Sequence, residues 1–410
     1  SGLRAADKEY DGTTEATLDY SRVGLIGKQS GDDLSITGTG HFADTCGVRV
    51  EVIVDELTLT GKDKDNYVLA ERPVTGVFGL INPRPVTVSG ITARNKVYDG
   101  TTNAVVVCDN AVIHNLVPGD TLTVTAEGRF VDANVGNGKE VTITKLRLRG
   151  TVYDDFKYKL ADEGQQTQTT ANITPVAVTV TAADTSVAYG DTPSFTVSYD
   201  GFIDGEDETA LSGTLDFECD YLSHMGVGSY DVIPKGLTSD NYTIAFESGT
   251  LTVTPRPVTV SGITAENKVY DGNTQATLDY SKVKLDGKLE GDDLSVTATG
   301  TFDANFGGTR RVILTDLTLT GEDKDNYVLA KTGQQPETVA SIIAKPVKIS
   351  GISARDKTYD GTTDVTLVYD NMFIDGLVEG DRLPVTVEGC FKDATAGEGK
   401  QVTITGLRLD

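Results

Sequence analysis

Short stretches in which apolar and polar residues alternate recur along most of this chain. "DDLSVTATGTF" (residues 292–302) is one, and "KEVTITKLRLRG" (139–150) and "RRVILTDLTLTG" (310–321) alternate over a longer span. A period of two places successive side chains on opposite faces of a β-strand. Gly, Asp and Asn between the runs are typical of turns. The pattern predicts about six to eight short strands in every ~85 residues, and one helical turn near residues 201–211.

The motif "KVYDGTT" (residues 96–102) recurs in related forms along the chain. Near-copies begin at Lys8, Lys268 and Lys357, and the four motif tyrosines are 88, 172 and 89 residues apart. The middle interval is two periods wide and contains a divergent copy, Tyr189-Gly190-Asp191. Repetition at a fixed period indicates one structural unit per repeat. The chain therefore comprises five modules.

Similarity among the modules gives them an order. Residues 8–70 align without a gap with residues 268–330, and residues 96–148 align in the same way with residues 357–409. The middle module matches neither type, so the order is A-B-C-A-B, as duplication of a three-module block would produce. Short proline-containing segments such as "INPRPVTVSGIT" connect the modules, and proline stiffens them by fixing φ. The predicted modules are 1 (residues 1–83, type A, without its first strand), 2 (84–174, type B), 3 (175–254, type C), 4 (255–345, type A) and 5 (346–410, type B, truncated before its last segment).

The predicted fold class is all-β. Each module is expected to be a small antiparallel β-sandwich or a β-grasp-like fold. A domain of this size is about 30 Å across, so an elongated array of five would span about 150 Å.

The recurring Tyr-Asp-Gly motif has a catalytic and a structural interpretation. Asp-Gly is a strong tight-turn signal, and a tyrosine before it can bury its ring while its hydroxyl stays hydrogen-bonded. An active site is seldom repeated in tandem, and His41, His114 and His224 occupy unrelated positions in their modules. We therefore predict that the protein is not an enzyme and has no catalytic residues. The predicted structural motif comprises Tyr10, Asp11, Gly12, Tyr98, Asp99, Gly100, Tyr189, Tyr270, Asp271, Gly272, Tyr359, Asp360 and Gly361.

Charge and cysteine content narrow the class of protein. The formal net charge of −25 opposes binding to nucleic acid, whose phosphates require Lys and Arg. No apolar run is long enough to cross a membrane as a helix, so we expect no membrane insertion in this segment. The cysteines lie at non-equivalent module positions, and we expect free, buried thiols rather than disulfides: Cys46, Cys108, Cys219 and Cys390.

Two acidic loops are candidates for a calcium site. "GKDKDNY" (61–67) and "GEDKDNY" (321–327) present carboxylates at alternate positions, and the "GDDL" segments add more. Calcium prefers six to eight oxygen ligands, although these loops lack the glycine and distal glutamate of an EF-hand. The alternative is Asx-turn chemistry on a solvated corner. We expect no cofactor unless calcium binds, for which the candidate ligands are Asp63, Asp65, Asn66, Asp323, Asp325 and Asn326.

A covalent cross-link between lysine and asparagine is another possibility for these modules. Lys8, Lys96, Lys268 and Lys357 recur, as do Asn66, Asn241 and Asn326, but module 2 has Asp155 at the asparagine position.

The ordered motifs resemble a known family. "KVYDGTT", "GDDLSVTATGTF", "VDANVGNGKEVTIT" and "LTLTGEDKDNYVLA" are similar to the YDG repeats of bacterial surface adhesins of the filamentous-haemagglutinin type. "VAYGDTPSFTVSYDGFIDGED" in module 3 resembles the accompanying MBG repeats of the YGX type. The resemblance covers essentially the whole chain. It implies a non-enzymatic stalk or adhesive repeat, extracellular on a bacterial surface or secreted.

The leading functional hypothesis is a stalk that projects a distal binding domain of an adhesin. The alternative is an adhesive repeat that itself binds a host or bacterial glycan or protein, with calcium-stiffening as a further variant. Segment 216–236 of module 3 is the candidate for a specialised contact. We expect a monomer.

Overall fold

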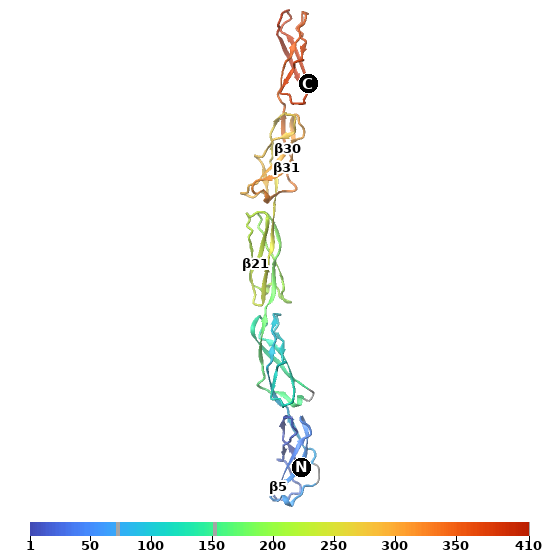
Figure 1. Cartoon of the computed structure of the whole chain (residues 1–410), viewed down its shortest axis with the longest axis vertical. Coiled ribbons are helices and arrows are strands. Elements are labelled where there is room, and N and C mark those ends of the chain that lie inside the picture. The colour runs from blue at the N-terminus through green and yellow to red at the C-terminus, as the bar shows by residue number, and fades with distance from the viewer. Residues whose placement is uncertain (71–73, 151–153, 410) are drawn as a thin grey trace. The chain divides into compact units, whose positions relative to one another are not determined.

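The computed structural model describes residues 1–70, 74–150 and 154–409, and strands dominate it (Figure 1). The all-β class predicted from the sequence is confirmed. The chain divides into two compact units, and the division falls inside module 3. The first unit contains residues Ser1–Thr181, Val197–Asp216 and Pro234–Glu247, and the second contains Ala182–Thr196, Phe217–Ile233 and Ser248–Asp410.

Modules 1 and 2 lie in the first unit. Module 1 contains β1 (Arg4–Ala5), β2 (Lys8–Glu9), β3 (Leu18–Asp19), β4 (Ser35–Phe42), β5 (Gly47–Thr60), the 3₁₀ turn η1 (Lys64–Asn66) and β6 (Phe78–Asn82). Module 2 contains β7 (Arg84–Ser89), β8 (Thr92–Ala93), β9 (Lys96–Val97), β10 (Asn103–Ala104), β11 (Val106–Val107), β12 (Val112–His114), β13 (Thr123–Phe130), β14 (Gly136–Arg149), α1 (Asp154–Lys157), β15 (Tyr158–Leu160) and β16 (Gln168–Thr174).

Module 3 begins with β17 (Val176–Ala182). It continues with β18 (Thr185–Ala188), β19 (Val197–Asp200), η2 (Glu208–Ala210), β20 (Ser212–Cys219), β21 (Gly228–Thr238), β22 (Tyr242–Glu247) and β23 (Gly249–Thr254). The helical turn predicted near residues 201–211 corresponds to η2, whereas the turns at α1 and η1 were not predicted.

Modules 4 and 5 lie in the second unit. Module 4 contains β24 (Arg256–Ser261), β25 (Thr264–Ala265), β26 (Lys268–Val269), β27 (Gln275–Ala276), β28 (Leu278–Asp279), β29 (Lys284–Asp286), β30 (Ser295–Phe302), β31 (Gly308–Thr320), η3 (Lys324–Asn326), β32 (Tyr327–Leu329) and β33 (Glu337–Ile343). Module 5 contains β34 (Lys348–Ser350), β35 (Ser353–Ala354), β36 (Leu367–Val368), β37 (Phe373–Asp375), β38 (Val385–Phe391) and β39 (Val402–Leu409).

Modules 2 and 4 share one topology. In module 2 a five-stranded sheet has the order β10-β13-β14-β16-β9, and smaller sheets have the orders β12-β7-β15 and β11-β8. Module 4 repeats this arrangement as β27-β30-β31-β33-β26, β29-β24-β32 and β25-β28. Apolar side chains from the large and small sheets form one core, as Val88 and Val124 do in module 2. The alternating sequence runs therefore bury one face of each sheet.

The sheets are mixed rather than purely antiparallel, which corrects the sequence prediction. β13 and β14 pair antiparallel, but β15 runs parallel to β7 and β16 runs parallel to β9. Parallel neighbours are joined by a long crossover instead of a hairpin, so a local sequence pattern cannot reveal the pairing. These two parallel pairs hold the closing segment of module 2, which we define as residues 154–174.

The core of module 1 continues into module 2. Phe42 and Tyr10 of module 1 belong to the same apolar cluster as Val86 and Tyr158 of module 2. The junction between these modules is therefore packed, and proline is not its only source of stiffness.

The cysteines are free thiols, as predicted, but they are half-buried rather than buried. At Cys46 and Cys108 burial raises the pKa of the thiol, which disfavours the reactive thiolate.

Candidate functional site: the tyrosine joints

The Tyr-Asp-Gly motif forms a closed hydrogen-bonded turn. In module 1, Asp11 Oδ1 accepts hydrogen bonds from the backbone N–H and hydroxyl of Thr13 at 2.9 and 2.8 Å. Lys8 Nζ lies 2.8 Å from the same Asp11 oxygen and donates to the Thr13 carbonyl. Gly12 has φ of +80°, a left-handed conformation that glycine adopts without strain.

The turn recurs with the same contacts in the other YDG modules. The lysine–aspartate distance is 2.6 Å at Lys96–Asp99, 2.6 Å at Lys268–Asp271 and 2.8 Å at Lys357–Asp360. Hydrogen bonds from Lys357 and then Thr362 lower the pKa of Asp360 to about 2. The glycines Gly100, Gly272 and Gly361 also have positive φ. The aspartate, glycine and lysine of each motif are thus used within the turn.

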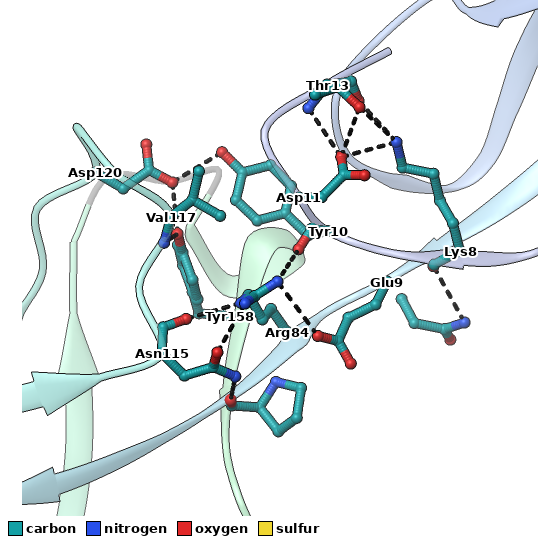
Figure 2. Close-up of polar contacts among 12 residues, drawn as sticks. Lys8, Glu9, Tyr10, Asp11, Thr13, Arg84, Asn115, Val117, Asp120 and Tyr158 are labelled. Carbon is teal, nitrogen blue, oxygen red and sulfur yellow. Dashed lines mark hydrogen bonds and ion pairs between the residues drawn. The ribbon is translucent and has the colours of Figure 1, made fainter. Parts of the chain in front are cut away.

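The motif tyrosine points out of the turn and into the next module (Figure 2). Tyr10 is 3% exposed and packs edge-to-face on Tyr158 of module 2, with ring centroids 5.3 Å apart at 78°. Both hydroxyls donate to one carboxylate oxygen, Asp120 Oδ2, at 2.8 Å from Tyr10 and 2.6 Å from Tyr158. We call this arrangement of two tyrosines and one acid from two modules a tyrosine joint.

Two further junctions have the same construction. Tyr98 packs on Tyr242 at 5.6 Å and 75°, and their hydroxyls donate to Glu206 at 2.7 and 2.6 Å. In the second unit, Tyr189 packs on Tyr327 at 5.5 Å and 79°, and both hydrogen-bond Asp292. The divergent Tyr189-Gly190-Asp191 copy therefore fills the same role as the YDG copies.

In the described part of the chain, the last two motif tyrosines and Tyr67 of module 1 do not form such a pair of tyrosines between two modules. Tyr270 hydrogen-bonds Asp381 of module 5, which holds the position of Asp120. Tyr359, in contrast, is 67% exposed. In module 1, Tyr67 corresponds to Tyr327, and its hydroxyl donates to Asp32 and accepts from Gln29 N.

Backbone and arginine contacts fix the joints. The hydroxyl of the second tyrosine donates to the acid and also accepts a hydrogen bond from a backbone N–H. In the first joint, Val117 N donates to Tyr158 Oη at 3.0 Å. Arg84 Nη1 donates to the Tyr10 carbonyl at 3.4 Å and its Nε to the Asn115 carbonyl at 2.8 Å. Arg256 repeats these contacts with Tyr189 and Gly287.

Sequence reasoning did not assign the partners of the motif tyrosines. The missed residues are the second tyrosines, their acids and the arginines before the joint prolines: Tyr158, Tyr242, Tyr327, Asp120, Glu206, Asp292, Asp381, Arg84 and Arg256. A usable signal was present, because an Asp or Glu follows the glycine in "GDTL", "GEDE", "GDDL" and "GDRL".

The candidate calcium ligands take part in loop hydrogen bonds. Asp63 Oδ2 accepts from Asp33 N at 2.8 Å, and Asp323 Oδ2 accepts from Asp293 N at 2.8 Å. The other four candidates lie in short turns: Asp65 and Asn66 in η1, and Asp325 and Asn326 in η3. Across residues 1–70, 74–150 and 154–409, no group of three or more His, Cys, Asp or Glu side chains is arranged to hold a metal ion.

Two of the three asparagines considered for a cross-link accept hydrogen bonds from the preceding module. Asn241 Oδ1 accepts from Val135 N at 2.9 Å, and Asn326 Oδ1 accepts from Val227 N at 3.0 Å. The lysines are engaged in their own turns, as Lys268 is with Asp271 and Asn273. The lysines thus stabilise the motif turns, whereas Asn241 and Asn326 connect neighbouring modules.

Segment 216–236 of module 3 also contributes to a junction. Tyr221 and Met225 belong to the apolar cluster that contains Tyr189 and Tyr327.

Burial and hydrogen bonding at the joints shift the pKa values of the tyrosines and of Asp120. Burial and then the hydrogen bond to Asp120 raise the pKa of Tyr158 to about 12. The hydrogen bond to Glu206 and then burial raise the pKa of Tyr98 to about 12. Burial opposes ionisation of Asp120, but the two tyrosine hydroxyls outweigh it and hold its pKa below the usual value. The joint is therefore most stable with neutral tyrosines and an ionised acid.

We expect alkaline pH to weaken the joints before it unfolds the sheets. Since the folded-state pKa of Tyr98, Tyr158 and Tyr327 is about 12 against an ordinary 10.0, their contribution is complete below pH 10 and is lost as the pH rises to 12. Ultraviolet titration of phenolate alongside urea denaturation at each pH measures both events. A joint-tyrosine titration near pH 10 with no change in stability would contradict the expectation.

The fold and joints define a class of protein, a tandem array of small β-modules connected through packed junctions. A family model for the YDG domain matches residues 1–75, 82–170, 254–335 and 343–410, and a model for the MBG domain (YGX type) matches residues 178–252. The chain belongs to the YDG-domain family and carries one MBG domain of the YGX type. This confirms the family resemblance inferred from the sequence.

Solved structures of repeat proteins show a distant similarity. Drosophila N-cadherin EC1-4 is 10% identical, with a TM-score of 0.23, over 83% of this chain and 98% of that chain. Drosophila N-cadherin EC1-3 is 10% identical, with a TM-score of 0.18, over 62% of this chain and 98% of that chain. A search of the curated proteins gives no match. No helix in the described part of the chain is long and apolar enough to cross a membrane.

Proposed function

We propose that this chain is a structural stalk segment of an extracellular bacterial adhesin, which projects a binding domain away from the cell. The observation that carries the proposal is the tyrosine joint. Four successive motif tyrosines, Tyr10, Tyr98, Tyr189 and Tyr270, reach an acid of the following module. A motif used to connect modules supports a mechanical role rather than a catalytic one.

The joints supply the stiffness that a spacer needs. Bending at a junction would separate two buried aromatic rings and expose them to water, and would leave the acid without its hydroxyl partners. Edge-to-face aromatic pairs contribute about 0.5–1.5 kcal/mol beyond their burial. Hydrogen bonds to charged groups add about 1.5–3 kcal/mol. Each joint therefore resists bending by more than a proline linker alone would.

Segment 216–236, considered for adhesion, has a structural use at a junction. This favours the stalk over an adhesive role for module 3.

Small-angle scattering tests the stalk proposal. Five modules of about 30 Å in line predict a maximum dimension of about 150 Å, and a value well under ~100 Å would overturn the proposal. The measurement is made with calcium and again with a chelator. A calcium-stiffened stalk would show a larger dimension and a higher Tm with calcium, because a ligand that binds only the native state stabilises it. If the maximum dimension and the Tm are the same with calcium and with the chelator, the calcium-stiffened stalk is ruled out.

A further inference from the structure

Two segments of module 2 run side by side and in the same direction, from one junction to the next. The opening segment, which we define as residues 84–98, begins with β7 and ends at Tyr98 of the second tyrosine joint. The closing segment, residues 154–174, brings Tyr158 to the first joint and ends with β16, just before module 3. A force applied along the chain therefore enters module 2 at the beginning of one segment and leaves it at the end of the other.

Parallel strand pairs connect the two segments at both ends. At the first junction β7 pairs with β15, and Arg84 lies opposite Tyr158. At the second junction β9 pairs with β16, and Tyr98 N donates to the Thr174 carbonyl at 2.8 Å. Because both strands of each pair point toward module 3, a pull on the closing segment slides it along the opening segment.

Two glutamine side chains connect the segments between these strand pairs. Gln166 accepts from Ile91 N at 2.8 Å and donates to the Ile91 carbonyl at 2.7 Å. Gln165 accepts from Val88 N at 2.9 Å and donates to the Val86 carbonyl at 2.9 Å. The two segments are thus bonded at their ends by strand pairing and in their middle by side chains.

Module 4 contains the same pair of segments. β24 runs parallel to β32, and β26 runs parallel to β33. Gln334 and Gln335 repeat the glutamine contacts with the backbone of the opening segment. Tyr270 N donates to the Ile343 carbonyl at 2.9 Å. The pairing of opening and closing segments is therefore a repeated feature of the array.

Module 3, the MBG domain, has parallel pairs in the same places with longer ladders. β17 runs parallel to β22, with residues 176–181 opposite residues 242–247. β18 runs parallel to β23, with Ala188 opposite Thr254, and Tyr189 N donates to the Thr254 carbonyl at 2.9 Å. Two different repeat families thus join their opening and closing segments in the same way.

An Asp or Asn side chain just before the second strand pair adds one more bond in each of these modules. Its Oδ1 accepts a hydrogen bond from a backbone N–H of the last strand. The pairs, with the acceptor first, are Asn95–Asn172 at 2.8 Å, Asp184–Thr250 at 2.8 Å and Asn267–Ser341 at 2.7 Å. Each bond crosses from one segment to the other, so a pull along the chain loads it together with the strand pair.

We propose that modules 2, 3 and 4 bear tension along the chain through the parallel pairing of their opening and closing segments. Bonds that cross between two sliding segments carry the load together and have to break together. Strands that are peeled apart from one end lose their bonds one at a time, which requires less force. Forced unfolding depends on the height of the unfolding barrier rather than on equilibrium stability. This function goes beyond that of a spacer, which only holds its length at rest.

Single-molecule force spectroscopy on the full 410-residue chain, with a handle at each end, tests the proposal. We expect modules 2, 3 and 4 to open in separate, abrupt events. Each event should release about 250–300 Å, from ~3.6 Å per extended residue less a folded diameter of ~30 Å. Gradual extension at low force, without abrupt events of this length, would overturn the proposal.

Two substitutions in module 2 separate resistance to force from ordinary stability. Gln166→Ala removes bonds between the two segments, whereas Val124→Ala removes buried methyl groups from β13, outside both segments. Urea denaturation first measures how much each lowers equilibrium stability. At constant force we expect Gln166→Ala to speed one opening event about tenfold, and Val124→Ala to speed it less than about twofold, because β13 is still folded when the segments slide.

Two further variants test the location of the effect. Gln335→Ala should speed a different event, that of module 4, and the double variant with Gln166→Ala should speed both. Asn95→Ala removes a single bond at an exposed residue and should act in the same direction as Gln166→Ala, even if Gln166→Ala prevents module 2 from folding.

The comparison of Gln166→Ala with Val124→Ala decides the proposal. If the two variants sped opening equally for the same loss of equilibrium stability, the paired segments would carry no particular load and the proposal would fail. Its failure is distinguishable from failure of the stalk proposal, because scattering measures the length of the chain at rest and pulling measures its resistance to force.

Discussion

Replacing Tyr10 with alanine is expected to destabilise the first two modules by about 3–5 kcal/mol, the range for removing a large aromatic side chain from a core. Tyr10 is 3% exposed, and its loss opens a cavity beside Tyr158 and removes one of the two hydroxyls bonded to Asp120. Urea denaturation followed by hydrogen exchange in modules 1 and 2 measures the change. Modules 4 and 5 lie in the other unit and should keep their protection.

Tyr359→Ala is the matched control, because it changes the same motif where the ring is 67% exposed. Surface substitutions usually change stability by about 0.5 kcal/mol or less. Tyr10→Phe separates the two contributions, since it keeps the ring and removes only the hydrogen bond to Asp120. If Tyr10→Ala were as mild as Tyr359→Ala, the joint would not contribute to stability and the stalk proposal would lose its support.

Gln166→Ala is expected to destabilise module 2 by several kcal/mol although Gln166 is not hydrophobic. Its amide satisfies both the N–H and the C=O of Ile91, a residue that is 1% exposed. A buried backbone group that loses its partner costs about 1–3 kcal/mol, and here two lose theirs. Thermal denaturation combined with hydrogen exchange at Ile91 reports both the stability and the site of the loss.

Gln168→Ala provides the control for this prediction. Gln168 is an exposed glutamine of the same closing segment, and its amide donates to Glu140. Water can replace that contact, so we expect almost no change. Equal effects of the two substitutions would show that the N–H and C=O of Ile91 find other partners and that the Gln166 side chain is dispensable.

Local features of this protein followed from its sequence. Alternation at period two predicted the long strands β14 and β31 because side-chain direction in a strand depends only on neighbouring residues. The Asp-Gly step predicted a turn with positive φ, and Gly12 has one because its lack of Cβ allows that conformation.

The joints and the parallel strand pairs were decided by tertiary structure. Tyr10 and Asp120 are 110 residues apart and belong to different modules. The glycine–acid step that recurs in each following module marks candidate acids, but it does not show that a tyrosine of the preceding module packs against them. The acid is Asp120 in one joint and Glu206 in the next, so even its residue type varies.

The sequence by itself determined an all-β chain of five repeated modules with a tight turn at each motif. Only the tertiary structure decided what the motif tyrosine does, because a buried hydroxyl takes whichever acceptor the next module brings within reach. That acceptor depends on how two modules pack, and packing is a property of surfaces assembled from distant parts of the chain.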